Sequence, residues 1–252
     1  MTDPERRRAL KSLLLLGGAW LGGCDRLSRS DRFVRLLESV EPVNETLQRA
    51  LTGQALAREY TEADISPVFR PNGQTNPQNP EYRKLAANHF ADYRLRIGGL
   101  VKNPMRLSLA EIRALPARSQ ITRHDCVEGW SAIGQWRGAR LGPLLERVEP
   151  LPGARFVVFH CADLWGPAQE PYYESIDLDE AHHLQTLLAY ELNGAPLPIA
   201  NGAPLRLRLE RQLGYKMAKY IMAIELVDSF APIAGGRGGY WEDRGYEWYA
   251  GI

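Results

Sequence analysis

Two patterns of hydrophobic and polar positions divide the chain. Between residues 31 and 57, apolar side chains such as Phe33 and Leu36 recur at helical spacing, which predicts one or two helices. Residues 66–80 are rich in proline, asparagine and glycine, which indicates an extended loop, and residues 69–72 within it could line a site. After this loop, short alternating runs typical of strands are interleaved with short helical runs. This mixture predicts a mixed, β-rich α+β fold rather than a doubly wound sheet.

Local signals place several elements of the β-rich part. Ser108 and Glu111 form a capping box, which predicts the start of a short helix. Pro143 predicts the start of a second helix, because proline suits the first helical position. Asn193 and Gly194 predict a tight turn between two strands. The predicted strands cover residues 93–97, 156–161, 188–192, 205–210 and 220–227.

The N-terminus is typical of an export signal rather than of a folded domain. A cluster of arginines precedes an apolar run at 13–21, which is shorter than the ~20 residues that a membrane-crossing helix needs. Residues 6–11 resemble the twin-arginine signal, which exports folded proteins. Residues 21–24 resemble a bacterial lipobox, in which Cys24 would carry the lipid. A plain basic N-terminus with an uncleaved anchor is the alternative.

Composition and charge narrow the functional classes. The chain has 252 residues and a formal net charge of +1, which argues against a general nucleic-acid binder with its basic excess. The three cysteines, Cys24, Cys126 and Cys161, are too few and too scattered for a disulfide framework or a zinc ribbon. Each cysteine therefore needs its own explanation.

One cysteine stands in an unusual setting. Within the stretch 123–131, Cys126 has a carboxylate, a histidine, an arginine and an indole as close neighbours. An inert buried cysteine prefers apolar neighbours, whereas positive charge lowers a thiol pKa and favours the thiolate needed for attack or metal binding. His124 lies two positions earlier, which on a strand places both side chains on the same side. Cys126 is therefore either a reactive group or a core residue.

Two further segments combine glycines with basic residues. Residues 201–206 end in Arg206, and residues 212–219 contain Lys216. Glycine permits close backbone approach, and arginine and lysine can hold a phosphate. The alternative for Arg206 is the solvent face of a strand, because charged residues alternate with leucines between positions 205 and 210.

Taken in order along the chain, these segments resemble the molybdopterin-binding domain of the sulfite oxidase superfamily. The resemblance runs from residue 64 to 252 and is close to the branch that contains the catalytic subunit of the periplasmic methionine sulfoxide reductase, which also carries Cys-Val-Glu. The motifs that carry it are residues 126–131, 172–176, 186–190, 201–206 and 214–216.

The resemblance implies a molybdenum–molybdopterin cofactor and a role for each candidate residue. Cys126 would bind the metal through its thiolate, which suits a metal already bound to the dithiolene sulfurs of the pterin. Glu128 would hydrogen-bond near the metal or transfer a proton, with a structural salt bridge as the alternative, and His89 would reach the pocket. Cys161 stands where the reductase branch has a pterin-contacting threonine. The residues implied to hold the pterin and its phosphate are Asn88, Cys126, Cys161, Asn201, Arg206, Gly214, Tyr215 and Lys216.

The resemblance also implies a domain organisation. Residues 1–24 would be the export signal, residues 25–63 a helical segment or linker, and residues 64–252 the catalytic domain. No room remains for the dimerisation and haem domains of full sulfite oxidases, so we expect a monomer. The sequence has no Cys-x-x-Cys-His haem motif, so electrons must pass to or from a separate protein, such as a membrane haem protein or a cytochrome.

The implied activity is two-electron oxygen-atom transfer at molybdenum, in the periplasm or on the outer face of the cytoplasmic membrane. The leading hypothesis is reduction of an S-oxide or N-oxide, carried by a small molecule or by an oxidised side chain. A sulfite dehydrogenase is the alternative enzyme. A cofactor-free binding protein on the same scaffold is the non-enzyme alternative. No nucleic-acid partner is expected.

Overall fold

The computed structural model describes residues 29–252, and the chain divides into two compact units after Gly53. In the first unit, the described residues form one helix, α2 (Asp31–Thr52), which ends at Gly53 with a φ of 49°. The helical prediction is confirmed, although the helix ends before residue 57. The predicted export signal and Cys24 lie outside the described residues. Among residues 29–252, no helix is long and apolar enough to cross a membrane.

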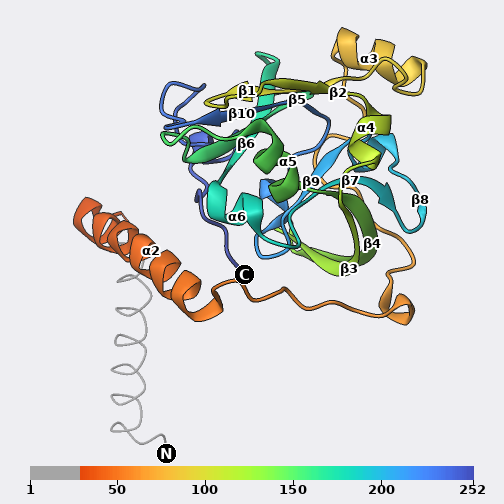
Figure 1. The fold of residues 1–252 in the computed structure, drawn as a ribbon. Coiled ribbons are helices and arrows are strands. Elements are labelled where there is room, and N and C mark those ends of the chain that lie inside the picture. The colour runs from red at the N-terminus through yellow and green to blue at the C-terminus, as the bar shows by residue number, and fades with distance from the viewer. Residues whose placement is uncertain (1–28) are drawn as a thin grey trace, which may run out of the picture. The chain divides into compact units, whose positions relative to one another are not determined.

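Two five-stranded sheets form the second unit, Gln54–Ile252 (Figure 1). The first contains, in spatial order, β2 (Met105–Leu107), β1 (Leu95–Gly99), β10 (Ile221–Val227), β5 (Phe156–Trp165) and β6 (Glu170–Asp177). The second contains β3 (Ala117–Cys126), β4 (Trp130–Arg140), β7 (Leu187–Leu192) and β8 (Ala195–Pro196), and β9 (Arg206–Arg208) also pairs with β7. Only the β1–β10 pair is parallel among these strands. The predicted β-rich α+β class is confirmed.

Short helices connect the strands. The helix after Ser108 begins where the sequence predicts, whereas the helix predicted to start at Pro143 begins two residues earlier, at Leu141. The capping box is present, because Ser108 Oγ accepts the Glu111 N–H at 3.3 Å and Glu111 Oε2 accepts the Ser108 N–H at 2.7 Å. Asn193 and Gly194 form the predicted turn with positive φ angles of 52° and 74°. The helices are α3 (Pro80–Ala87), α4 (Leu109–Arg113), α5 (Leu141–Val148), α6 (Leu178–His182), η1 (Glu62–Asp64), η2 (Ile199–Asn201), η3 (Gly214–Lys216) and η4 (Glu242–Arg244).

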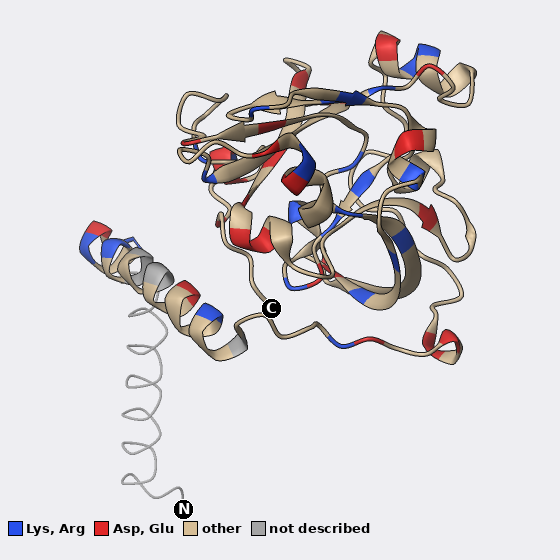
Figure 2. Ribbon diagram, in the orientation of Figure 1, with Lys and Arg blue, Asp and Glu red and all other residues tan. Residues whose placement is uncertain are grey.

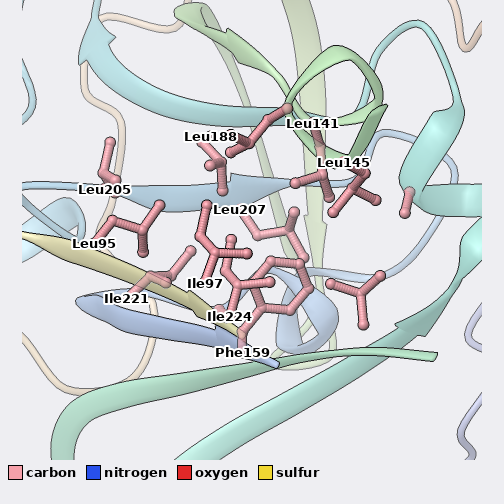
Figure 3. Close-up of a cluster of buried hydrophobic side chains, with 14 of the residues drawn as sticks. Leu95, Ile97, Leu141, Leu145, Phe159, Leu188, Leu205, Leu207, Ile221 and Ile224 are labelled. Carbon is pink, nitrogen blue, oxygen red and sulfur yellow. The ribbon is translucent and has the colours of Figure 1, made fainter. Parts of the chain in front are cut away.

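The main hydrophobic core joins both sheets and α5 (Figure 3). Ile97 and Phe159 come from the first sheet, Leu188 and Leu207 from the second, and Leu145 from α5. All five side chains are buried. Protein interiors are close-packed, so one side chain can move little without displacing its neighbours. This shared core therefore holds the two sheets as one body and fixes the loops that carry the candidate site.

Basic and acidic positions are interspersed along the strands and loops of the second unit (Figure 2). Strand β9 differs because both of its arginines are buried. Arg206 and Arg208 are both 0% exposed, so the alternative that Arg206 lies on the solvent face is contradicted. Arg208 is neutralised by Glu210 through hydrogen bonds of 2.9 and 2.5 Å. Arg206 has no carboxylate partner among the described residues, and its guanidinium lies 5.0 Å from the centre of the Trp136 ring. A buried charge without a counterion is costly unless a ligand completes the site.

Candidate cofactor site

A pocket of about 290 Å³ lies at the C-terminal end of β3. Cys126, predicted as the metal ligand, is the last residue of β3 and lines this pocket. A turn through Gly129 (φ 83°) leads into β4, so strand pairing fixes the position of the thiol. The pocket walls also come from the loop at 72–74, from η3 and from the C-terminal segment. Segments far apart in the sequence therefore meet around Cys126.

The Cys126 thiol is half-buried and forms no disulfide. Burial raises the pKa of this thiol, and the effect outweighs the opposite influence of Arg70 and Arg206. The basic residues that act on Cys126 therefore come from other segments of the chain and not from the stretch 123–131, and they do not make Cys126 a free thiolate. A coordinating metal removes the proton of a thiol outright, so the setting suits a metal ligand better than a free nucleophile.

Arg206 and Asn201 present unused hydrogen-bond donors beside the pocket. Arg206 donates to the Asn201 carbonyl oxygen at 3.0 Å and to Asn72 Oδ1 at 3.4 Å. Its buried Nε, and the buried Nδ2 of Asn201, have no partner within the described part of the chain. Burial and the nearby Arg208 lower the pKa of Arg206 to about 9. Leaving a buried donor unsatisfied costs about 1–3 kcal/mol. A bound anion or other hydrogen-bond acceptor would satisfy both the Arg206 Nε–H and the Asn201 amide.

Lys219 is a second buried cation, and it lines the pocket. Its Nζ donates to the backbone carbonyl oxygens of Asn72 at 2.6 Å, Ala200 at 2.9 Å and Gln74. Burial and the charge of Arg206 lower the pKa of Lys219 to about 7. These contacts join the loop at 72–74 to the segment before β9. Lys219 has no ion-pair partner among the side chains that the structure describes.

Asp163 offers the opposite chemistry in the same pocket. The residue is 3% exposed, and its Oδ2 accepts the Trp165 Nε1–H at 2.7 Å. Its Oδ1 has no partner in the region described, residues 29–252. Burial raises the pKa of Asp163 to about 6. The pocket therefore provides an unused acceptor for N–H groups beside its unused donors.

The structure places Lys216, predicted to hold the phosphate, away from the pocket lining. Its Nζ forms buried ion pairs with Glu174 and, at 2.6 Å, with Glu242. All three side chains are at most 1% exposed. Two carboxylates already neutralise Lys216, so the free positive charge of this segment lies at Lys219 instead. The sequence pattern could not separate two lysines three positions apart.

Asn88 and His89, also predicted as site residues, are not brought to the pocket. Asn88 follows α3, and its Nδ2 donates to Asp92 Oδ2 at 2.6 Å. His89 is exposed and adopts a positive φ of 55°. Asn72 lines the pocket instead, and it is the one residue of the stretch 69–72, expected to line a site, that does so.

Cys161 lies in the main core rather than in the pocket lining. Its thiol is 3.9 Å from the Phe159 carbonyl oxygen, and burial raises its pKa well above the usual value. Cys126 and Cys161 are both free, and no disulfide joins them. A direct pterin contact by Cys161 stays a prediction.

Of three further residues predicted at the site, Tyr215 and Glu128 line the pocket, whereas Gly214 packs against His124. A Cβ on Gly214 would lie 2.3 Å from His124 Cε1, so only glycine fits against the buried imidazole. Tyr215 lines the pocket, and its hydroxyl donates to the Glu247 carbonyl oxygen at 2.6 Å. Glu128 also lines the pocket and accepts the Trp130 Nε1–H at 2.9 Å. Within residues 29–252 no salt bridge of Glu128 is present, and its role near the metal stays a prediction.

These features fit a molybdopterin. Its phosphate would meet the Arg206 guanidinium and the Asn201 amide, its pterin N–H groups the free oxygen of Asp163, and its metal the soft thiolate of Cys126. Residues 83–232, more than half of the chain, match the family described as the oxidoreductase molybdopterin binding domain. The chain belongs to this family and is a molybdopterin-dependent oxidoreductase that binds the molybdenum–molybdopterin cofactor. The superfamily resemblance is thus confirmed, and the cofactor-free alternative is not supported.

Two known proteins are similar to this chain over most of its length. A candidate protein-methionine-sulfoxide reductase subunit, YedZ1 from Azospira oryzae, is 38% identical over 98% of this chain and 88% of the relative. The protein-methionine-sulfoxide reductase catalytic subunit MsrP from Xanthomonas campestris is 38% identical over 91% of this chain and 72% of the relative. The solved structure of the sulfane dehydrogenase SoxCD from Paracoccus pantotrophus is 20% identical, with a TM-score of 0.49, over 55% of this chain and 39% of that chain.

Retention of the cofactor is expected to weaken as the pH rises above about 7. Lys219 has a pKa of about 7 in the cofactor-free chain, and a nearby phosphate would raise that value. Binding then takes up a proton, so affinity is highest below pH 7 and falls by at most about tenfold per pH unit above it. Molybdenum analysis after gel filtration at about pH 6 and about pH 9 measures the effect. Lys219→Arg is the control that should flatten the profile, and a flat wild-type profile contradicts the participation of Lys219.

Proposed function

We propose that the enzyme reduces S-oxides, in particular methionine sulfoxide in polypeptides, with release of the oxygen as water. Both similar sequences named above are methionine sulfoxide reductase subunits by name. The observation that carries the proposal is the charge of the pocket. Asp163 and Lys219 would face the cofactor, so among the described lining residues Glu128 is the charged side chain that remains for the substrate. Such a lining disfavours the sulfite anion and suits a neutral S-oxide.

The site residues have two roles: some bind the cofactor, and one supplies protons. Bound cofactor supplies the two-electron chemistry. Arg206 and Asn201 would hold the phosphate with the charge of Lys219 close by, and Cys126 would hold the metal. Glu128 is exposed and is oriented by the Trp130 indole N–H, so it can take protons from water and pass them to the departing oxygen. One S-oxide, two electrons and two protons give one sulfide and one water.

A steady-state assay with the holoenzyme tests both direction and substrate. We expect a reduced viologen dye to be oxidised in the presence of methyl sulfoxides, with N-oxides as weaker substrates. We expect no reduction of a dye acceptor by sulfite. Turnover with sulfite and none with sulfoxides would establish the sulfite dehydrogenase alternative.

We further propose that the chain is exported in folded form and is anchored by a lipid on Cys24. The arginine-rich residues 6–11 and the lipobox-like residues 21–24 support this, as does the need to load a metal–pterin cofactor before export. The protein would then work as a monomer in the periplasm, on the outer face of the cytoplasmic membrane. A separate membrane haem protein or cytochrome would supply its electrons.

An Arg6→Lys, Arg7→Lys variant is expected to accumulate inside the cell, folded and still holding molybdenum. The reason is that a twin-arginine-type route recognises the arginine pair rather than positive charge alone. Cell fractionation with metal analysis measures the result, and Cys24→Ala is the companion variant, which should release a soluble exported form. An exported wild-type protein whose mature N-terminus is not Cys24 would contradict the lipid anchor. Normal export of the double variant would contradict the twin-arginine signal.

A further inference from the structure

The C-terminal segment contributes an aromatic wall, Trp241 and Tyr246, to the pocket that contains Cys126. The two rings stack with centroids 5.3 Å apart and an interplanar angle of 29°. Tyr246 also packs edge-on against Tyr215, with centroids 5.1 Å apart, and Trp241 against Trp165, with centroids 5.6 Å apart. Tyr246 is 39% exposed, so the wall reaches from the interior of the pocket to its mouth.

The residues between the two rings anchor this wall. Glu242 is buried and pairs with Lys216 at 2.6 Å, which ties the segment to the η3 turn beside the cofactor site. Asp243 accepts the Arg237 backbone N–H at 2.9 Å and the Tyr173 hydroxyl at 2.7 Å. The aromatic rings are therefore held in place before any substrate arrives, which lowers the entropy cost of binding.

An S-oxide has a polar part and an apolar part, and the pocket lining contains side chains that suit each of them. Its S–O bond is polar, and Glu128 in the lining can supply the protons that this oxygen needs, whereas its substituents on sulfur are apolar. Sulfur and methyl groups make favourable contacts with aromatic rings. The buried ion pairs of Glu242 and Lys216 keep charge away from the aromatic wall, which leaves it an apolar surface.

Resting on the proposed S-oxide reductase function, we propose that Trp241 and Tyr246 receive the apolar substituents of the substrate sulfur. Trp241 is then a specificity-determining residue. It selects sulfoxides with a large apolar group over small or strongly polar ones, and it leaves cofactor binding and proton supply to other residues. An oxidised methionine side chain has the required shape, since its apolar thioether carries the S–O bond.

The test compares holoenzymes of wild type, Trp241→Ala and Trp241→Phe with methyl phenyl sulfoxide, dimethyl sulfoxide and trimethylamine N-oxide. For Trp241→Ala we expect KM for methyl phenyl sulfoxide to rise roughly tenfold to a hundredfold, the range that loss of one buried aromatic contact produces. The two small substrates should change much less, and Trp241→Phe should recover most of the loss. Arg237→Ala, in the same segment but exposed, is the matched control and should behave as wild type.

Molybdenum content, measured on every variant, separates selectivity from cofactor loss. Normal metal content with a KM change confined to the aromatic sulfoxide supports the wall. An equal loss with all three substrates, or a loss of metal in Trp241→Ala and Trp241→Phe alike, overturns it. A wild type that reduces no S-oxide at all overturns the proposed function, and this proposal with it. A wild type that reduces S-oxides, beside a Trp241→Ala variant whose substrate preference is unchanged, overturns only the wall.

Discussion

Replacing Cys126 with serine is expected to reduce turnover by about 100-fold or more while the fold is kept. Loss of residues that merely support metal ligands already costs about 10–100-fold, and Cys126 is the only described cysteine in the pocket lining. Serine is close in size at this half-buried position, so packing changes little. Steady-state kinetics and the electron paramagnetic resonance spectrum of molybdenum measure the effect, and the spectrum should change with the ligand.

Cys161→Ser is the matched control, because Cys161 lies in the core and outside the lining. We expect a mild loss of stability and nearly normal turnover. Full activity with an unchanged spectrum in Cys126→Ser contradicts the ligand assignment. Equal and total loss in both variants would point instead to a shared redox pair.

An Arg206→Ala, Lys219→Ala double variant is expected to lose the cofactor while remaining folded. Loss of the Arg206 hydrogen bond to a charged group removes about 1.5–3 kcal/mol, roughly a tenfold to hundredfold weaker hold, and loss of the Lys219 charge weakens the hold further. Both cations lack a carboxylate partner of their own among the described residues, so their removal leaves no buried anion behind. Molybdenum and pterin content after dialysis measure the loss, with thermal unfolding as the check on the fold.

Lys216→Met provides the contrast. Removing Lys216 leaves Glu174 and Glu242 buried without a counterion, and breaking a buried pair in this way costs about 3–5 kcal/mol of stability. We expect a clearly lower midpoint of thermal unfolding, with cofactor content per folded molecule close to normal. The opposite result, a stable Lys216→Met variant without cofactor, would return the phosphate role to Lys216.

The sequence was sufficient for features that depend on neighbours in the chain. The capping box of Ser108 and Glu111 and the turn at Asn193 each depend on a few adjacent residues, and both are present. Cys126 could be singled out because its own stretch is unusual, and the order of motifs along the chain identifies the superfamily. Such features need no knowledge of how distant segments pack.

The remaining site features depend on partners far apart in the sequence. Lys216 and Lys219 look alike in the chain, but only Lys216 meets Glu174 and Glu242. Asn72 reaches the pocket through a loop whose path is fixed by Lys219 and not by its own pattern. The same holds for Trp241 in the C-terminal segment, which aromatic content alone does not distinguish from ordinary packing.

The account is tested most directly by following the oxygen atom. Methionine sulfoxide in a peptide, labelled with heavy oxygen at sulfur, is incubated with the holoenzyme and a reduced dye. We predict that one oxygen is lost per methionine, that the label appears in water, and that two electrons are consumed for each sulfide formed. A peptide that keeps its labelled oxygen, beside an enzyme that converts sulfite to sulfate with a dye acceptor, would contradict the central claim.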